Sequence, residues 1–119
     1  MPLSRQVEQV GVQHSIEEIA ERTTAVFAFL RDDGLLLRER RILFPESFKG
    51  GFVLIFAGEG REITVEYLDM QFEVRAGSAE IFGPNTHPQF AGNVFSREHF
   101  LEHLSQLAVV VQMRLVSNT

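Results

Sequence analysis

The sequence has no cysteine and no tryptophan, and it has one tyrosine (Tyr67) and one lysine (Lys49) among its 119 residues. Without cysteine the chain can form neither a disulfide framework nor a thiolate nucleophile. Eleven Lys and Arg residues stand against sixteen Asp and Glu, for a formal net charge of −5 at pH 7. A nucleic-acid-binding protein needs a cationic face, so this balance argues against that class and favours solubility or docking onto a basic partner.

Long apolar runs are also missing. The N-terminal residues Met1 to Gln6 lack the apolar core of a signal peptide, and no apolar run reaches the roughly 20 residues that a membrane-spanning helix needs. Together with the absence of cysteine, this predicts a cytoplasmic protein that does not contact a membrane.

The chain does contain material for a globular core. Hydrophobic residues make up 45% and charged residues 23% of the sequence, and eleven phenylalanines supply bulk, so disorder is not expected. A chain of this length fits one domain, which we predict to span residues 1–119, and it can bury about two-thirds of the surface that its unfolded form exposes.

Two segments have helical patterns. Ser15 followed by Glu18 forms a capping box, apolar or small residues recur at helical spacing, and Asp33-Gly34 provides a C-terminal stop, which predicts a helix over residues 16–31. Ser96 is expected to cap a second helix, whose apolar stripe runs from Phe100 to Leu115. The β-branched run 109–111 falls partly off that stripe, so residues 108–119 are left as either helix or strand.

Between the helices the pattern is extended. Strands are predicted over Leu35 to Phe44, Phe52 to Ala57, Ile63 to Arg75 and Ala79 to Phe82, with a tight hairpin turn at Gly58-Glu59-Gly60. The apolar run 52–57 suggests a central strand covered on both faces. The inward positions of run 63–75 change from odd to even numbers, which suggests a bulge or bend near Leu68-Asp69.

These elements predict an α+β fold, in which an antiparallel sheet of four to five strands has an N-terminal and a C-terminal helix packed on one face. The other face would then stay open to solvent or to a partner. Residues 83–93 form a long irregular segment, and segments of this length are often functional in small domains.

The middle of the chain is acidic. From 59 to 80 the sequence has two arginines, Arg61 and Arg75, and the following acids: Glu59, Glu62, Glu66, Asp69, Glu73 and Glu80. Like charges on neighbouring strands repel each other, so a surface that carries them is either a solvated sheet face or a binding surface. The hypothesis of a binding surface takes Glu62, Glu66, Asp69 and Glu73, with His87 and Phe90 of the long loop, as partner-binding residues.

Motifs for catalysis are weak. The sequence has no Gly-x-Ser-x-Gly elbow, and Gly58-Glu59-Gly60 precedes a strand rather than the helix that a phosphate site needs.

His99 and His103 have metal-ligand spacing, and Glu102 or His87 could add a ligand, but the zinc-protease pattern is absent because Phe100 follows the first histidine. Two histidines without a third ligand are a weak signal, and ordinary helix-flank histidines are the favoured interpretation of the pair. We therefore predict no enzyme activity, no cofactor, no catalytic residue and no metal site, with His99 and His103 as the alternative candidate metal ligands.

The stretch Ile81-Phe82-Gly83-Pro84, followed by His87 and by Phe90 to Glu98, leads from a loop into a final amphipathic helix. With the compact acidic α+β character, it resembles the small cytosolic immunity proteins of bacterial toxin–immunity systems. The resemblance implies tight binding and neutralisation of a cognate toxin, often a basic nuclease, by masking its active site. Two alternatives stay open: a secretion-type chaperone or adaptor, usually dimeric, that holds a client segment, and a small metal- or ligand-binding protein that uses the histidine pair.

Overall fold

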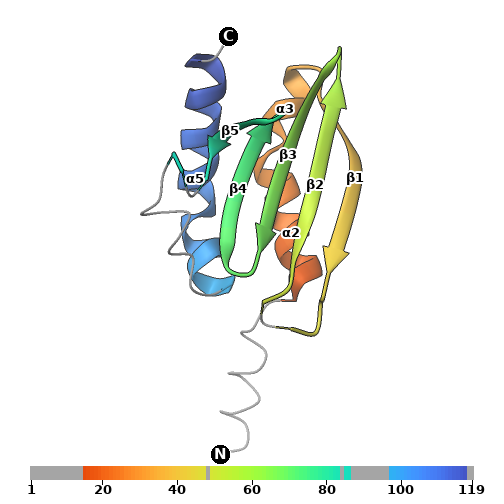
Figure 1. Ribbon diagram of the computed structural model, residues 1–119, viewed down its shortest axis with the longest axis vertical. Coiled ribbons are helices and arrows are strands. Elements are labelled where there is room, and N and C mark those ends of the chain that lie inside the picture. Colours follow the sequence, from red (N-terminus) through yellow and green to blue (C-terminus); the bar gives the residue numbers. More distant parts are fainter. Residues whose placement is uncertain (1–14, 48, 84, 87–96, 118–119) are drawn as a thin grey trace, which may run out of the picture.

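A computed structural model describes residues 15–47, 49–83, 85–86 and 97–117, which form two layers (Figure 1). One layer is a five-stranded antiparallel sheet in the order β1-β2-β3-β4-β5, and helices cover one of its faces. This confirms the predicted α+β fold. The described elements are α2 (Ile16–Val26), α3 (Phe29–Asp32), β1 (Leu36–Leu43), β2 (Gly51–Gly58), β3 (Arg61–Leu68), β4 (Gln71–Ala76), β5 (Ala79–Phe82) and α5 (Arg97–Ser117).

The first helix begins as predicted but does not run unbroken to residue 31. Ser15 caps α2, because its Oγ accepts a hydrogen bond from the Glu18 backbone N–H at 3.0 Å. A turn at residues 27–28 then separates α2 from α3. The Thr23 hydroxyl donates back to the Ile19 carbonyl at 2.7 Å, and such bonds bend helices. Gly34, at φ +83°, ends the second piece as expected.

The prediction of one extended run with a bulge or bend near Leu68-Asp69 is wrong, because the chain reverses there. Run 63–75 is two strands, β3 and β4, which pair from Ile63↔Ala76 to Leu68↔Gln71. Asp69 and Met70 form the two-residue turn, with φ of 52° and 63°. Two left-handed residues in sequence are the geometry that matches the twist of a hairpin. The apparent change of inward positions is therefore the passage from one strand to the next. The hairpin turn predicted at Gly58-Glu59-Gly60 is confirmed, with Gly58 paired to Arg61.

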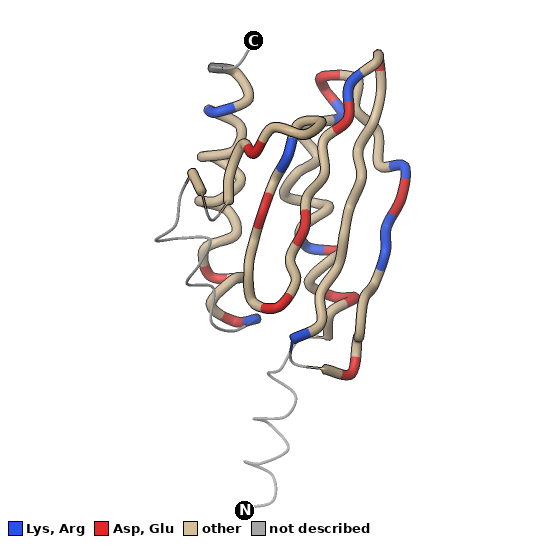
Figure 2. Tube along the Cα trace, in the orientation of Figure 1, with Lys and Arg blue, Asp and Glu red and all other residues tan. Residues whose placement is uncertain are grey.

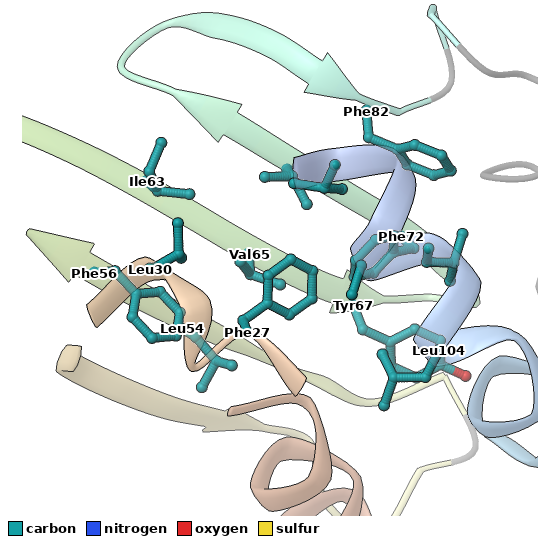
Figure 3. Packing of buried hydrophobic residues seen from close by; sticks show 14 of the residues in the cluster. Phe27, Leu30, Leu54, Phe56, Ile63, Val65, Tyr67, Phe72, Phe82 and Leu104 are labelled. Carbon is teal, nitrogen blue, oxygen red and sulfur yellow. The ribbon is translucent and has the colours of Figure 1, made fainter. Parts of the chain in front are cut away.

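The core lies between the sheet and the helices (Figure 3). Alternate residues of the central strands are buried beneath the helices: Phe52, Leu54, Phe56, Ile63, Val65, Tyr67, Phe72 and Val74. Their neighbours Val53, Ile55 and Ala57 are only partly buried. The expectation that β2 is covered on both faces is thus wrong for the part of the chain that the structure describes, where the helices cover one face.

The C-terminal segment is helix through Ser117. Residues 108–117, which the sequence left as either helix or strand, are therefore helical. Phe100 anchors this helix, because its ring stacks on Tyr67 with centroids 4.6 Å apart and lies 5.2 Å from the ring of Phe72. Leu104, Leu107, Val111 and Leu115 continue the buried stripe. The stripe has helical spacing, and the burial that it provides outweighs the β propensity of the valines. Among the described residues, no helix combines the length and apolar character needed to cross a membrane.

Candidate protein-binding face

The sheet face that turns away from the helices is called here the open face. Side chains of directly opposed residues on antiparallel strands lie on the same face. Val53 is opposite Glu66, which is opposite Glu73, and Ile55 is opposite Thr64, which is opposite Arg75. These residues alternate with the buried core positions, so they lie on the open face. Its members on β2, β3 and β4 are Val53, Ile55, Ala57, Glu62, Thr64, Glu66, Leu68, Gln71, Glu73 and Arg75.

Charge on the open face is arranged around Arg75. Its Nη1 lies 3.3 Å from Glu73 Oε2, and its Nη2 lies 3.7 Å from Glu66 Oε1. Glu66 and Glu73 are direct cross-strand partners and would repel each other without this guanidinium between them. Their side chains are 28% and 25% exposed, so the pair is partly shielded from water. One positive charge compensates two negative ones, and one net negative charge remains at the centre of the face.

The other predicted carboxylates extend this centre into a line. Glu62 lies on the same face four residues before Glu66, which corresponds to roughly 13 Å along a strand, and it is exposed. Asp69 is at the turn between β3 and β4, also exposed, and its backbone N–H donates to the Lys49 carbonyl at 2.8 Å. Figure 2 shows these acidic positions along β3, β4 and their turn. The structure thus pairs Glu66 with Glu73, places Glu62 farther along the same face and places Asp69 at one end.

His87 and Phe90, the other two predicted partner-binding residues, lie outside the described residues. The sequence interpretation also misses a feature of this face. Val53 and Ile55 form an apolar strip on β2 next to the carboxylates. In the sequence this strip cannot be told from the core positions, because residues 52–57 are all apolar. The signal that could have found it is the alternation of large phenylalanines with smaller residues along β2.

The candidate metal ligands lie on α5, away from the open face. Ligand atoms of His99, Glu102 and His103 all lie within 4.8 Å of one another. The two imidazole rings stack with centroids 5.2 Å apart and an interplanar angle of 10°. His103 Nδ1 is 3.0 Å from the carbonyl oxygen of His99. His99 and Glu102 are exposed and His103 is partly buried.

Two further titratable groups have altered environments. Burial raises the pKa of Tyr67, which the positive charge of Arg97 partly offsets, and the Tyr67 hydroxyl has no hydrogen-bond partner among the described residues. Burial acts to raise the pKa of Glu80 as well, but hydrogen bonds from Thr86 and Asn85 bring it below its ordinary value. Both are explained by packing and local turns, so neither adds a site.

Comparisons with protein-family models, curated proteins and solved structures give no match for this chain. A function for it therefore has to be inferred from the fold and from the geometry of the site.

Proposed function

We propose that this chain is a protein-binding domain that docks a cationic protein on its open face. The observation that carries the proposal is the position of three carboxylates, Glu62, Glu66 and Glu73, beside an apolar strip on a face that the described helices leave uncovered. Interfaces commonly combine an apolar centre with charged residues toward the rim. The open face has both components on rigid strands, which keeps the side chains in a fixed arrangement.

The two components would contribute differently. Carboxylates attract a basic partner over distances of about a Debye length and set its orientation, so they govern mainly the association rate and its salt dependence. Val53 and Ile55 would contribute the apolar burial that keeps the complex together. Glu66 and Glu73 would also contribute to specificity, because a guanidinium of the partner could take the place of Arg75 between the two carboxylates.

The specific role that we propose is that of a cytoplasmic immunity or inhibitor protein without enzymatic activity. It would neutralise a basic toxin by masking its active site, with carboxylates in the positions of substrate phosphates. The support for this role is the resemblance of type to immunity proteins, the net charge of −5 and the line of acids on β3 and β4.

The test is capture of the partner from the native host with tagged protein, with a matched pair of variants. E62Q/E66Q/E73Q removes three charges from the open face, and E21Q/E46Q/E98Q removes three exposed charges elsewhere. We expect wild type and the control to retain one stoichiometric basic protein that salt releases. We expect the open-face variant, if circular dichroism shows it folded, to lose it. Equal retention by both variants would contradict the proposal.

One observation favours the alternative of a chaperone or adaptor. The outer side of α5 exposes three large apolar side chains at helical spacing, Val109 (54% exposed), Met113 (64%) and Val116 (69%). Such a stripe suits a dimer contact or an amphipathic client segment. Light scattering at micromolar concentration separates the two functions, because a strict monomer argues against a dimeric chaperone.

A further inference from the structure

Polar side chains that ligate metals gather on the outer surface of α5, near its first turns. His99, Glu102 and His103 follow the i, i+3, i+4 spacing that places side chains together on one helix face. Their ligand atoms lie within 4.8 Å of one another. We propose that these three side chains form a binding site for Zn²⁺, separate from the open face of the sheet.

The distance requirement is modest. With Zn–N and Zn–O bonds of about 2.0–2.2 Å, tetrahedral ligand atoms are roughly 3.3 Å apart. The three ligand atoms therefore have to approach one another by at most about 1.5 Å, a distance that rotation about side-chain bonds covers. All three residues lie on the helix exterior, with two exposed and one partly buried, so this adjustment disturbs no core packing.

The hydrogen bond of His103 fixes the state in which this residue would bind. A backbone carbonyl can only accept, so the 3.0 Å contact with the His99 carbonyl requires that His103 Nδ1 carries the proton. In neutral imidazole the lone pair is then on Nε2, which is the nitrogen that ligates metal. A ligating histidine commonly donates its other N–H to a carbonyl in this way, which fixes the tautomer and orients the ring. The parallel ring of His99 presents the second nitrogen donor beside it.

The donor set selects the class of metal. Two imidazoles and one carboxylate suit Zn²⁺ and similar divalent transition ions, whereas Mg²⁺ and Ca²⁺ prefer oxygen ligands alone. Three protein ligands leave a fourth position for water or for a side chain of another molecule. The site is thus an open surface site rather than a closed structural one.

Isothermal titration of untagged protein with zinc sulfate tests the inference. We expect one site per chain with a micromolar dissociation constant and no heat with magnesium sulfate. H99A and H103A should each weaken binding at least tenfold, and E102Q several-fold. E98Q removes a carboxylate from the same turns, and H14A removes a histidine that is not among the proposed ligands, so neither control should change the affinity.

Thermal unfolding gives a second readout that does not depend on any partner. Zn²⁺ that bridges residues 99 and 103 binds only the folded helix, so it should raise the unfolding temperature of wild type and not of H99A/H103A. Alanine is a good helix former, so these surface variants should fold. The inference is overturned if wild type binds no Zn²⁺ at about 100 µM, or if H99A/H103A binds it as tightly as wild type.

Discussion

At the scale of single residues, Glu80 has a structural role that its sequence neighbours do not reveal. Its carboxylate accepts hydrogen bonds from the backbone N–H of Asn85 at 2.9 Å, the backbone N–H of Thr86 at 2.8 Å and the Asn85 side chain at 3.2 Å. Gly83 leaves room for this arrangement, because a Cβ there would lie 2.6 Å from the carboxylate carbon. One acid of the sequence pattern, which is opposite Arg75 in the sheet, thus uses its carboxylate to close the turn after β5.

Replacing this residue should make stability less dependent on pH. The folded-state pKa of Glu80 is lowered, so its contribution is fully present above the ordinary carboxylate range near 4.3 and is lost as the pH falls through the lower folded-state value. We expect E80Q to lower the free energy of unfolding by about 0.5–1 kcal/mol at pH 7, a small effect because the hydrogen bonds are exposed to solvent. Urea unfolding at pH 7 and near pH 3 checks this, and a difference from wild type that grows in acid would contradict it.

At the scale of the element, the β3–β4 hairpin has an unfavourable turn. Asp69 and Met70 both have left-handed backbone conformations, which cost a non-glycine residue about 1 kcal/mol or more. The tight turn between β2 and β3 places Gly60 at its second position, at φ +75°. We expect M70G to raise the free energy of unfolding by about 0.5–1 kcal/mol, as measured by urea unfolding. G60A reverses the change in the other hairpin and should lower it by a similar amount, with no side-chain clash because nothing lies within 4 Å of its Cβ.

This turn also shows where the sequence misleads. Ser15 and Gly34 are recognisable because a capping box and a left-handed glycine are local signals, and both are found at the expected helix ends. Asp-Met is not a turn dipeptide, so the pattern of β3 and β4 resembles one strand with a bulge. The break between α2 and α3 is equally invisible, since it depends on how Phe27 and Leu30 are buried and on the back-bonded threonines.

The candidate site, like the fold, can be predicted only in part from the sequence. Period-2 alternation places Glu62 and Glu66 on one side of a strand, and that assignment holds. The ion pairs of Arg75 with Glu66 and Glu73 depend on the register between two strands, which alternation within one run cannot give. Likewise, the apolar strip of β2 becomes a surface only once the helices are placed on the opposite face of the sheet.

At the scale of the whole molecule, the core and the proposed binding surface lie on opposite faces of the same sheet. The aromatic cluster of Phe52, Tyr67, Phe72 and Phe100 joins the sheet to α5 on one side. The open face can then carry like charges, because core burial on the other side of the same strands offsets their repulsion. Arg75 affects both stability and the proposed binding. It lowers the repulsion between Glu66 and Glu73, and it also reduces the negative charge that a basic partner would meet.

Removing Arg75 should therefore expose this conflict as a salt-dependent loss of stability. In R75Q, Glu66 and Glu73 remain direct neighbours without a cation, and we expect the free energy of unfolding to fall by about 0.5–1 kcal/mol at low salt. Molar salt screens the repulsion, so the difference from wild type should shrink in urea titrations at high salt. R22Q, which breaks the exposed Arg22–Glu18 helix pair at 3.3 Å, leaves no opposed carboxylates and should change less. If the R75Q deficit were independent of salt, Arg75 would act through packing, and the charge balance of the open face would not limit stability.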